Sequence, residues 1–180
     1  MCAGMISLVR TAFVYNFFFA FAMNILDKVF QWVFRLGYPL MCAVWRWIGF
    51  LSHIVHVAVW VDGKVLLVKN SYRSQYSLPG GDKHRKETSV FAASRELREE
   101  TGVIVSQSQL TCVLKLNEDE AWRNAPKRNE IFECRLENKP NIRVNNREVI
   151  HADFYTLDAA LSLPLPEVTR TYLRFQSRKR

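Results

Sequence analysis

Hydrophobic and polar positions divide the chain into two parts that meet near residue 52. Residues 1–52 contain 13 of the 23 aromatic residues and a single acidic residue, Asp27. Beyond residue 52, short apolar runs alternate with charged positions, and the other 16 acidic residues all lie there. We therefore expect a hydrophobic helical segment, residues 1–52, followed by one folded domain, residues 53–180. Chemistry that needs carboxylates belongs to the second part.

The second part opens with a pattern typical of a β-hairpin. Residues 53–61 are rich in β-branched residues, which favour a strand. Asp62-Gly63 is a common two-residue hairpin turn, and the apolar run at residues 64–69 predicts the returning strand. A loop then follows over residues 71–81, ending in Pro79-Gly80-Gly81.

The next long element is predicted to be a helix over residues 88–101. This stretch contains neither Gly nor Pro and places Val90, Ala93 and Leu97 at helical spacing, and Gly102 follows where a helix ends. The remaining pattern predicts strands at residues 103–105, 110–116, 130–136 and 152–157 and a closing helix at residues 166–175. The domain is thus of mixed α/β (α+β) class.

The first part is apolar enough to interact with a membrane. Its longest run without charge, residues 11–26, has 16 residues, and extending it back to residue 5 gives 22 with Arg10 near one end. A bilayer span needs about 20 apolar residues. A second apolar stretch, residues 29–51, is interrupted by Arg35 and Arg46 and is rich in Trp and Phe, as interfacial helices are. The alternatives are a signal peptide cleaved after Ala20-Phe21-Ala22 and a helix packed on the domain.

Charge indicates the location of the domain and the chemistry of its partners. If residues 1–52 hold one span, the basic residues lie on its C-terminal side, which places residues 53–180 in the cytoplasm. A soluble cytoplasmic protein is the alternative. The whole chain has 25 basic and 17 acidic residues, a net charge of +8. This balance favours anionic partners such as nucleotides, phosphorylated metabolites or acidic lipid, and no specific nucleic-acid partner is predicted.

Three glutamates on the predicted helix 88–101 are the main candidates for chemistry. Glu96, Glu99 and Glu100 are spaced i, i+3 and i+4, so they share one helix face. Carboxylates so close repel one another unless a positive charge lies among them, and a hard cation such as Mg²⁺ or Mn²⁺ prefers all-oxygen ligands. Arg95 could pair with Glu99. The alternative is an ordinary solvated acidic face.

The full stretch from Gly81 to Val103 resembles the Nudix box, G-x5-E-x7-R-E-U-x-E-E-x-G-U, where U is a bulky aliphatic residue. Every one of the nine defined positions matches: Gly81, Glu87, Arg95, Glu96, Leu97, Glu99, Glu100, Gly102 and Val103. The resemblance covers about residues 53–175. It implies a mixed β-sheet sandwiched between α-helices, here preceded by the hydrophobic N-terminal segment.

The resemblance implies a hydrolase that cleaves a diphosphate linkage in a nucleoside diphosphate joined to another moiety, with Mg²⁺ or Mn²⁺ as cofactor. It also implies roles for residues of the box and its surroundings. Glu96, Glu99 and Glu100, with the carbonyl of Gly80, are the expected metal ligands, and Glu87 and Arg95 the pair that holds loop and helix together. Glu99 and Glu100 are expected to be indispensable. Candidate bases outside the box are Glu118, Glu120 and Glu148, of which Glu148, just before the late strand, is preferred.

Residues outside the carboxylate set are candidates for substrate binding. Arg85, in the basic run Lys83-His84-Arg85-Lys86, could contact phosphate, and Tyr72, Tyr76 and Trp122 could stack on a base. Solvated loops and structural aromatic contacts are the alternatives. Two other functions stay open: a non-catalytic nucleotide-binding module, and a hydrolase of lipid-linked or prenyl diphosphates at a membrane.

Overall fold

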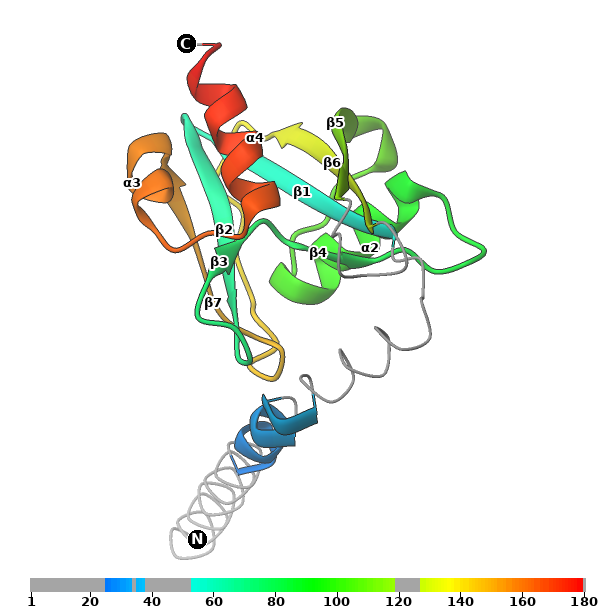
Figure 1. Ribbon diagram of the computed structural model, residues 1–180, viewed down its shortest axis with the longest axis vertical. Helices are drawn as coiled ribbons and strands as arrows, with labels where there is room; N and C mark the ends of the chain where they lie inside the picture. Colours follow the sequence, from blue (N-terminus) through cyan, green and yellow to red (C-terminus); the bar gives the residue numbers. More distant parts are fainter. Residues whose placement is uncertain (1–24, 34, 38–52, 119–126, 180) are drawn as a thin grey trace, which may run out of the picture.

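The computed structural model describes residues 25–33, 35–37, 53–118 and 127–179 of the chain. In this part of the chain, a mixed sheet of seven strands has the order β3-β2-β1-β6-β5, with β4 paired to β1 and β7 paired to β2 (Figure 1). The strands are β1 (His53–Val61), β2 (Lys64–Asn70), β3 (Tyr76–Ser77), β4 (Gly80–Asp82), β5 (Thr111–Glu118), β6 (Lys127–Arg135) and β7 (Val149–Thr156). The helices are α2 (Ser89–Thr101), α3 (Leu157–Ser162) and α4 (Glu167–Ser177), with a 3₁₀ turn η1 (Gln107–Gln109).

Strand β1 is the centre of the sheet. It forms the predicted hairpin with β2, and both turn residues have positive φ, 49° at Asp62 and 73° at Gly63, as a type I′ turn requires. Along its length it pairs in parallel with β6, and its first residues pair with β4. The glycine-rich start of the acidic stretch is therefore bonded directly to the middle of the sheet.

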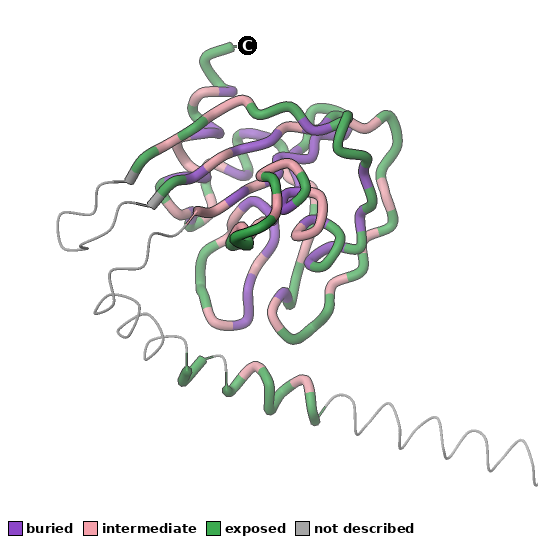
Figure 2. The backbone as a smooth tube through the Cα atoms, turned by 90° about the vertical axis from the view of Figure 1, so that its right-hand side faces the viewer, coloured by how far each residue is buried: buried purple, intermediate pink, exposed green. Residues whose placement is uncertain are grey.

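Helices cover both faces of the sheet, as the sequence predicts for this class. Side chains of β1 alternate between the two: Val55, Val57 and Val59 pack in a core with α2, whereas Ala58 and Trp60 pack in a core with α3 and α4. Both sets of side chains are buried, so most of β1 is buried, and Figure 2 shows buried positions gathered along the central strands of the domain. Since each residue step reverses the face, the register of β1 fixes which side receives α2.

Helix α2 begins and ends where the sequence predicts. The hydroxyl oxygen of Thr88 caps its N-terminus by accepting a hydrogen bond from the Phe91 N–H (3.3 Å). Gly102 ends it in the left-handed conformation, φ 70°, and donates its N–H to the carbonyl of Arg98 (2.9 Å). Leu97 and its apolar neighbours on the helix are fully buried against the sheet, so the acidic residues are left along its edge.

Three local predictions were wrong. Residues 103–105 form no strand: Val103 and Val105 are buried and Ile104 is 80% exposed, an alternation that packs on the core without strand pairing among the described residues. The loop 71–81 contains strand β3 and the start of β4, which form through pairing with β2 and β1 rather than through their own propensity. Helix α3 was not predicted, although Thr156 caps it by accepting from the Ala159 N–H.

Most of the hydrophobic N-terminal segment lies outside the described residues, including nearly all of the predicted span at 11–26 and the predicted cleavage site. Residues 25–33 and 35–37 are helical, and we refer to them as the N-terminal helix. Among the described residues, no helix combines the length and the apolar character needed to cross a membrane.

Candidate active site

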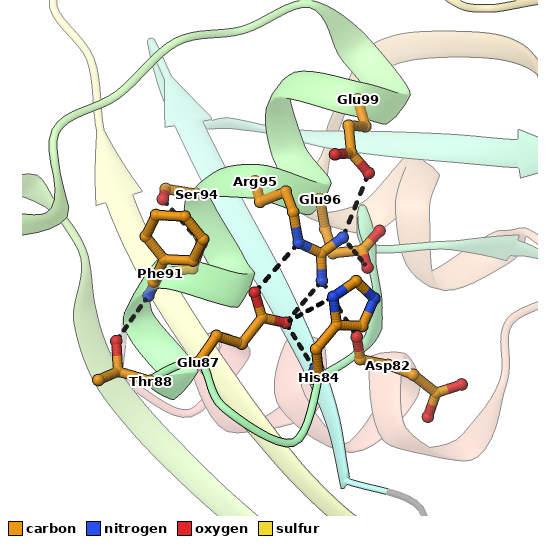
Figure 3. Close-up of polar contacts among 9 residues, drawn as sticks. All are labelled: Asp82, His84, Glu87, Thr88, Phe91, Ser94, Arg95, Glu96 and Glu99. Carbon is orange, nitrogen blue, oxygen red and sulfur yellow. Dashed lines mark hydrogen bonds and ion pairs between the residues drawn. The ribbon is translucent and has the colours of Figure 1, made fainter.

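Arg95 is the hub of the charged edge of α2 (Figure 3). Its guanidinium donates two hydrogen bonds to Glu87, from Nη2 to Oε1 (2.8 Å) and from Nε to Oε2 (3.2 Å). Nη1 donates to Glu96 (2.7 Å) and Glu99 (3.2 Å), and Nη2 also donates to the carbonyl oxygen of Asp82 (3.2 Å). One side chain thus joins the loop before α2, the helix and the end of β4.

The pair has the electrostatics of a structural clamp. Hydrogen bonds from Arg95 are the main reason that the pKa of Glu87 falls to about 2, and the N–H of His84, 2.6 Å from Glu87 Oε1, lowers it further. In turn Glu87 is the main cause that raises the pKa of Arg95 above its usual range. Both side chains are nearly covered, 13% and 10% exposed. The clamp is therefore charged at any pH well above 2, the lowered pKa of Glu87.

Glu100 points inward, unlike Glu99, whose side chain is 52% exposed. Glu100 is 5% exposed, and its Oε2 accepts a hydrogen bond from the backbone N–H of Gly80 (2.9 Å). Burial raises the pKa of Glu100 to about 8, and the negative charges of Glu148 and Glu96 raise it too, against hydrogen bonds from Gly80 and Asn70. The pKa of Glu96 is likewise raised, first by burial. Folding thus buries a carboxylate beside two others.

Two glycines let the backbone of β4 approach this edge. A Cβ at Gly81 would lie 2.7 Å from the carboxyl carbon of Glu96, so any side chain there would displace that carboxylate. Gly80 has φ 154°, and a Cβ there would lie 2.1 Å from the carbonyl oxygen of Val55. The space that a side chain would fill at position 81 is thus left to the Glu96 carboxylate.

Glu148 reaches the same edge from the loop that precedes β7. Its Oε1 accepts a hydrogen bond from the hydroxyl of Tyr72 (3.0 Å), and its carbonyl accepts from the N–H of Ser71 (2.7 Å). Its charge contributes to the raised pKa of both Glu96 and Glu100. Of the acids suggested outside the box, Glu148 is therefore brought to the acidic edge, by which we mean the edge of α2 that carries Glu96, Glu99 and Glu100. Glu118 ends β5, and Glu120 lies outside the described residues.

The carboxylates at this edge have the chemistry that a divalent cation requires, but they are not arranged around one common point. The carboxylates of Glu96, Glu100 and Glu148 repel one another and offer only oxygen ligands, which Mg²⁺ and Mn²⁺ prefer. The Glu96 carboxylate lies in the space that a side chain at position 81 would fill. In the part of the chain that the structure describes, no three His, Cys, Asp or Glu side chains gather around one point as a ligand set. Arg95 Nη1 contacts Glu96 and Glu99 instead. Arg95 Nη1 contacts one oxygen of each carboxylate, Oε1 of Glu96 and Oε2 of Glu99, so a cation would bind the other oxygens or these two carboxylates would turn.

Of the residues suggested for substrate binding, Arg85 and Tyr76 are described by the structure and belong to different elements. Arg85 is exposed in the loop before α2. Tyr76 packs edge-on against Tyr155 (5.8 Å between ring centroids) and His151 (6.2 Å) of β7, with the ammonium of Lys69 5.4 Å from its ring centroid. These contacts give Tyr76 a structural use. Trp122 lies outside the described residues.

Two contributors to the site were missed or misread from the sequence. Asn70, at the end of β2, is 7% exposed and hydrogen-bonds Glu100 as well as the hydroxyl of Tyr72 (3.2 Å). Tyr72, suggested as a stacking residue, donates to Glu148 instead. A polar residue closing an apolar strand just before Tyr72 was the available signal, but only the pairing of β2 with β7 brings both to the acidic edge.

Comparison with known proteins gives one family. The family model described as NUDIX domain matches residues 52–175, whereas among curated proteins none matches the chain. Among solved structures, a MutT NUDIX hydrolase from Burkholderia pseudomallei is 22% identical with a TM-score of 0.61, over 69% of this chain and 97% of that one. A C. elegans Ap4A hydrolase is 20% identical with a TM-score of 0.59, over 72% and 97%.

A third similar structure is larger than this chain. It is a bifunctional NMN adenylyltransferase/ADP ribose pyrophosphatase from Francisella tularensis, complexed with AMP and a Mn ion. It is 18% identical with a TM-score of 0.61, over 92% of this chain and 53% of that one. At these identities the structures establish the fold, and the family model covers more than half of the chain. The chain therefore belongs to the Nudix family of pyrophosphohydrolases.

Proposed function

We propose that this enzyme hydrolyses a diphosphate linkage in a nucleoside diphosphate joined to a second moiety, with Mg²⁺ or Mn²⁺ bound at the acidic edge of α2. The observation that carries the proposal is the meeting of Glu96, Glu100 and Glu148 at that edge, with Glu100 buried and held by the Gly80 N–H. Burying carboxylates together costs stability, and a cation offsets that cost. The stability of the fold alone gives no reason to bury these carboxylates together.

The reaction requires water to attack one phosphorus atom while the bond to the bridging oxygen breaks. A bound cation would supply neutralisation of the diphosphate charge and activation of the water. Glu96, Glu99 and Glu100, with the Gly80 carbonyl, would hold it. Glu148 is then the carboxylate outside the box best placed to take the proton from the water. Arg95 keeps the loop before α2 in place through Glu87.

The family relatives support a nucleotide-containing substrate. One is an Ap4A hydrolase, and another is an ADP ribose pyrophosphatase complexed with AMP and a Mn ion. The net charge of +8 agrees with an anionic substrate. We infer a nucleoside diphosphate derivative as the class, with dinucleotides and ADP-ribose as the first members to test.

The test is hydrolysis by the purified full chain with Mg²⁺ or Mn²⁺. The panel holds diadenosine tetraphosphate, ADP-ribose, a nucleotide sugar, a nucleoside triphosphate and a prenyl diphosphate. We expect metal-dependent cleavage of one nucleotide class, with phosphorylated products. Preference for the prenyl compound would replace the proposed substrate class. Saturable nucleotide binding without any product would indicate a non-catalytic module.

We further propose that the N-terminal helix rests on an anionic lipid surface, with the domain on the cytoplasmic side. Its apolar side chains are unusually open to solvent: Ile25, Leu26, Val29, Phe30, Trp32, Val33 and Leu36 are 42–68% exposed. Lys28 and Arg35 accompany them, and such a mixture favours the boundary between headgroups and acyl chains. Exposed apolar clusters of this kind are rarely left uncovered in a soluble protein.

Vesicle sedimentation tests this second proposal. The full chain should pellet with vesicles containing phosphatidylserine, and the charge-introducing variant Val33→Glu/Leu36→Glu should stay in the supernatant. Ile104→Glu is the matched control, because Ile104 is 80% exposed on the domain itself. Equal pelleting of all three proteins, or of none, would contradict the proposal.

A further inference from the structure

The N-terminal helix contacts the domain at the loop that carries Glu148. Asp27 Oδ1 accepts a hydrogen bond from Arg147 Nε (3.0 Å), and Gln31 Nε2 donates to the carbonyl of Asn146 (2.6 Å). The guanidinium of Arg147 also lies over the ring of Phe30, 4.9 Å from its centroid. Positions 27, 30 and 31 share one helix face. This face therefore holds the two residues immediately before Glu148 (Figure 1).

The domain holds the same loop from the other side, through its backbone. The side-chain oxygen of Asn145 accepts from the N–H groups of Arg147 (3.1 Å), Glu148 (3.0 Å) and Val149 (3.1 Å). Asn146 adopts a left-handed conformation, φ 58°. The hydroxyl of Ser71 donates to the carbonyl of Arg147 (2.8 Å). Arg147 is thus fixed by the domain at its backbone and by the N-terminal helix at its side chain.

One peptide unit separates Arg147 from Glu148, whose carboxylate lies at the acidic edge and accepts from Tyr72 (3.0 Å). Contacts of the Arg147 side chain therefore act on the chain segment whose backbone, held by Asn145 and Ser71, carries Glu148. The ion pair with Asp27 is partly exposed, 44% at Arg147 and 19% at Asp27, and pairs of that kind contribute little to stability. Stability alone does not account for three contacts converging on these two residues.

We propose that Arg147 is a positioning residue through which the N-terminal helix sets the place of the Glu148 carboxylate. The inference rests on the proposed function in treating Glu148 as a group of the reaction. It gives the hydrophobic N-terminal segment a second role, since whatever moves the N-terminal helix then acts on the site. Asp27 and Phe30 act through Arg147 and touch no reacting group.

The test compares Arg147→Met, which keeps the unbranched stem of the side chain but removes the guanidinium, with Arg147→Lys, which keeps the positive charge. The substrate is diadenosine tetraphosphate or ADP-ribose, whichever the full-length wild type cleaves faster. We expect Arg147→Met to lower kcat roughly tenfold with KM within about twofold, and Arg147→Lys to recover part of the loss. Asp27→Asn should act in the same direction more weakly. Asp153→Asn is the matched control, because Asp153 pairs with Lys139 on the surface, away from this loop.

Amide hydrogen exchange at residues 145–149 provides a readout that does not depend on turnover. Exchange there should be faster in Arg147→Met than in wild type and unchanged in Asp153→Asn. Wild-type kcat together with wild-type exchange in Arg147→Met would overturn the inference. If the wild type cleaves neither substrate, the proposed function fails for that class, and the exchange comparison still decides whether the N-terminal helix holds the loop.

Discussion

Two glutamates on opposite faces of the sheet, Glu133 partly buried and Glu100 buried, have very different surroundings. Glu133, on β6, accepts hydrogen bonds from the Tyr172 hydroxyl (2.8 Å), the Gln176 amide (2.6 Å) and Arg135 (2.7 Å). Tyr172 in turn accepts from the indole N–H of Trp60 (2.7 Å). Both carboxylate oxygens of Glu133 and the hydroxyl oxygen of Tyr172 thus have a donor, and the cluster joins β6 and β1 to α4. Such a network rigidifies the core and is stabilising when every member is satisfied.

Glu100 lies in the contrasting region. It is 5% exposed and so more deeply buried than Glu133, but its neighbours Glu96 and Glu148 carry the same charge, and the guanidinium of Arg95 contacts Glu96 and Glu99. Glutamate therefore stabilises the fold at position 133, whereas at position 100 it lowers the stability of the fold. Repulsion retained in a folded protein is typical of a functional site, since titratable groups are forced together there.

Removing the charge of Glu100 should separate the two roles most clearly. We expect Glu100→Gln, and likewise Glu99→Gln, to lower kcat/KM at least about 10²-fold, as losses of groups that act in the transition state do. The melting temperature of Glu100→Gln should stay at the wild-type value or rise, because a repulsive contact is removed. Steady-state kinetics and thermal unfolding measure the two effects. Wild-type turnover in both variants would refute the assignment of the site.

The Glu133 cluster should respond in the opposite way. Tyr172→Phe removes one hydroxyl that donates to Glu133 and accepts from Trp60, so the buried indole N–H of Trp60 loses its acceptor and Glu133 loses one of its donors. We expect the free energy of unfolding to fall by about 1–3 kcal/mol. Activity should stay within about twofold of wild type. Urea unfolding monitored by Trp fluorescence provides the measurement, and a loss of activity without loss of stability would blur the contrast.

The buried His56 provides a third case, in which the stability cost of burying a titratable side chain can be measured as a function of pH. Burial lowers the pKa of His56 to about 4 from an ordinary 6.5, although a hydrogen bond with Asn129 (3.2 Å) opposes this. Between these values the unfolded chain binds a proton that the folded chain does not, so the free energy of unfolding falls as pH drops from 6.5 towards 4. The loss attributable to His56 should be about 1–3 kcal/mol. His56→Gln should flatten this part of the stability profile, whereas His151→Gln, at an exposed position, should not.

Much of the fold and the core of the site could be predicted because local patterns determine them. The β1–β2 hairpin follows from the β-branched and apolar runs on either side of Asp62-Gly63, and α2 from its apolar spacing and from Gly102 at its end. The partnership of Glu87 with Arg95 was implied by the resemblance to the Nudix box and is present. Each of these features is contained in a stretch of fewer than 20 residues: the hairpin in 53–70, the helix with its end in 88–102 and the ion pair in 87–95.

Features that depend on distant pairing could not be predicted in the same way. Asn70 and Glu148 meet the acidic edge only because β2 pairs with β7, and the Tyr76 ring packs on β7 for the same reason. The strand predicted at residues 103–105 failed because apolar alternation also suits an irregular segment packed on a core. Contacts of the N-terminal helix with Arg147 join residues 120 positions apart, with no local signal.

Cation binding at the acidic edge is the central claim, and a thermal shift with Mn²⁺ tests it most directly. The full chain, freed of metal with a chelator, is unfolded by heat with and without Mn²⁺, in parallel with Glu100→Gln and Glu133→Gln. We predict that Mn²⁺ at roughly one hundred times its Kd raises the Tm of wild type and of Glu133→Gln by about 5–10 °C. Glu100→Gln should show little or no shift. An equal shift in all three proteins, or none in the wild type, would contradict the account.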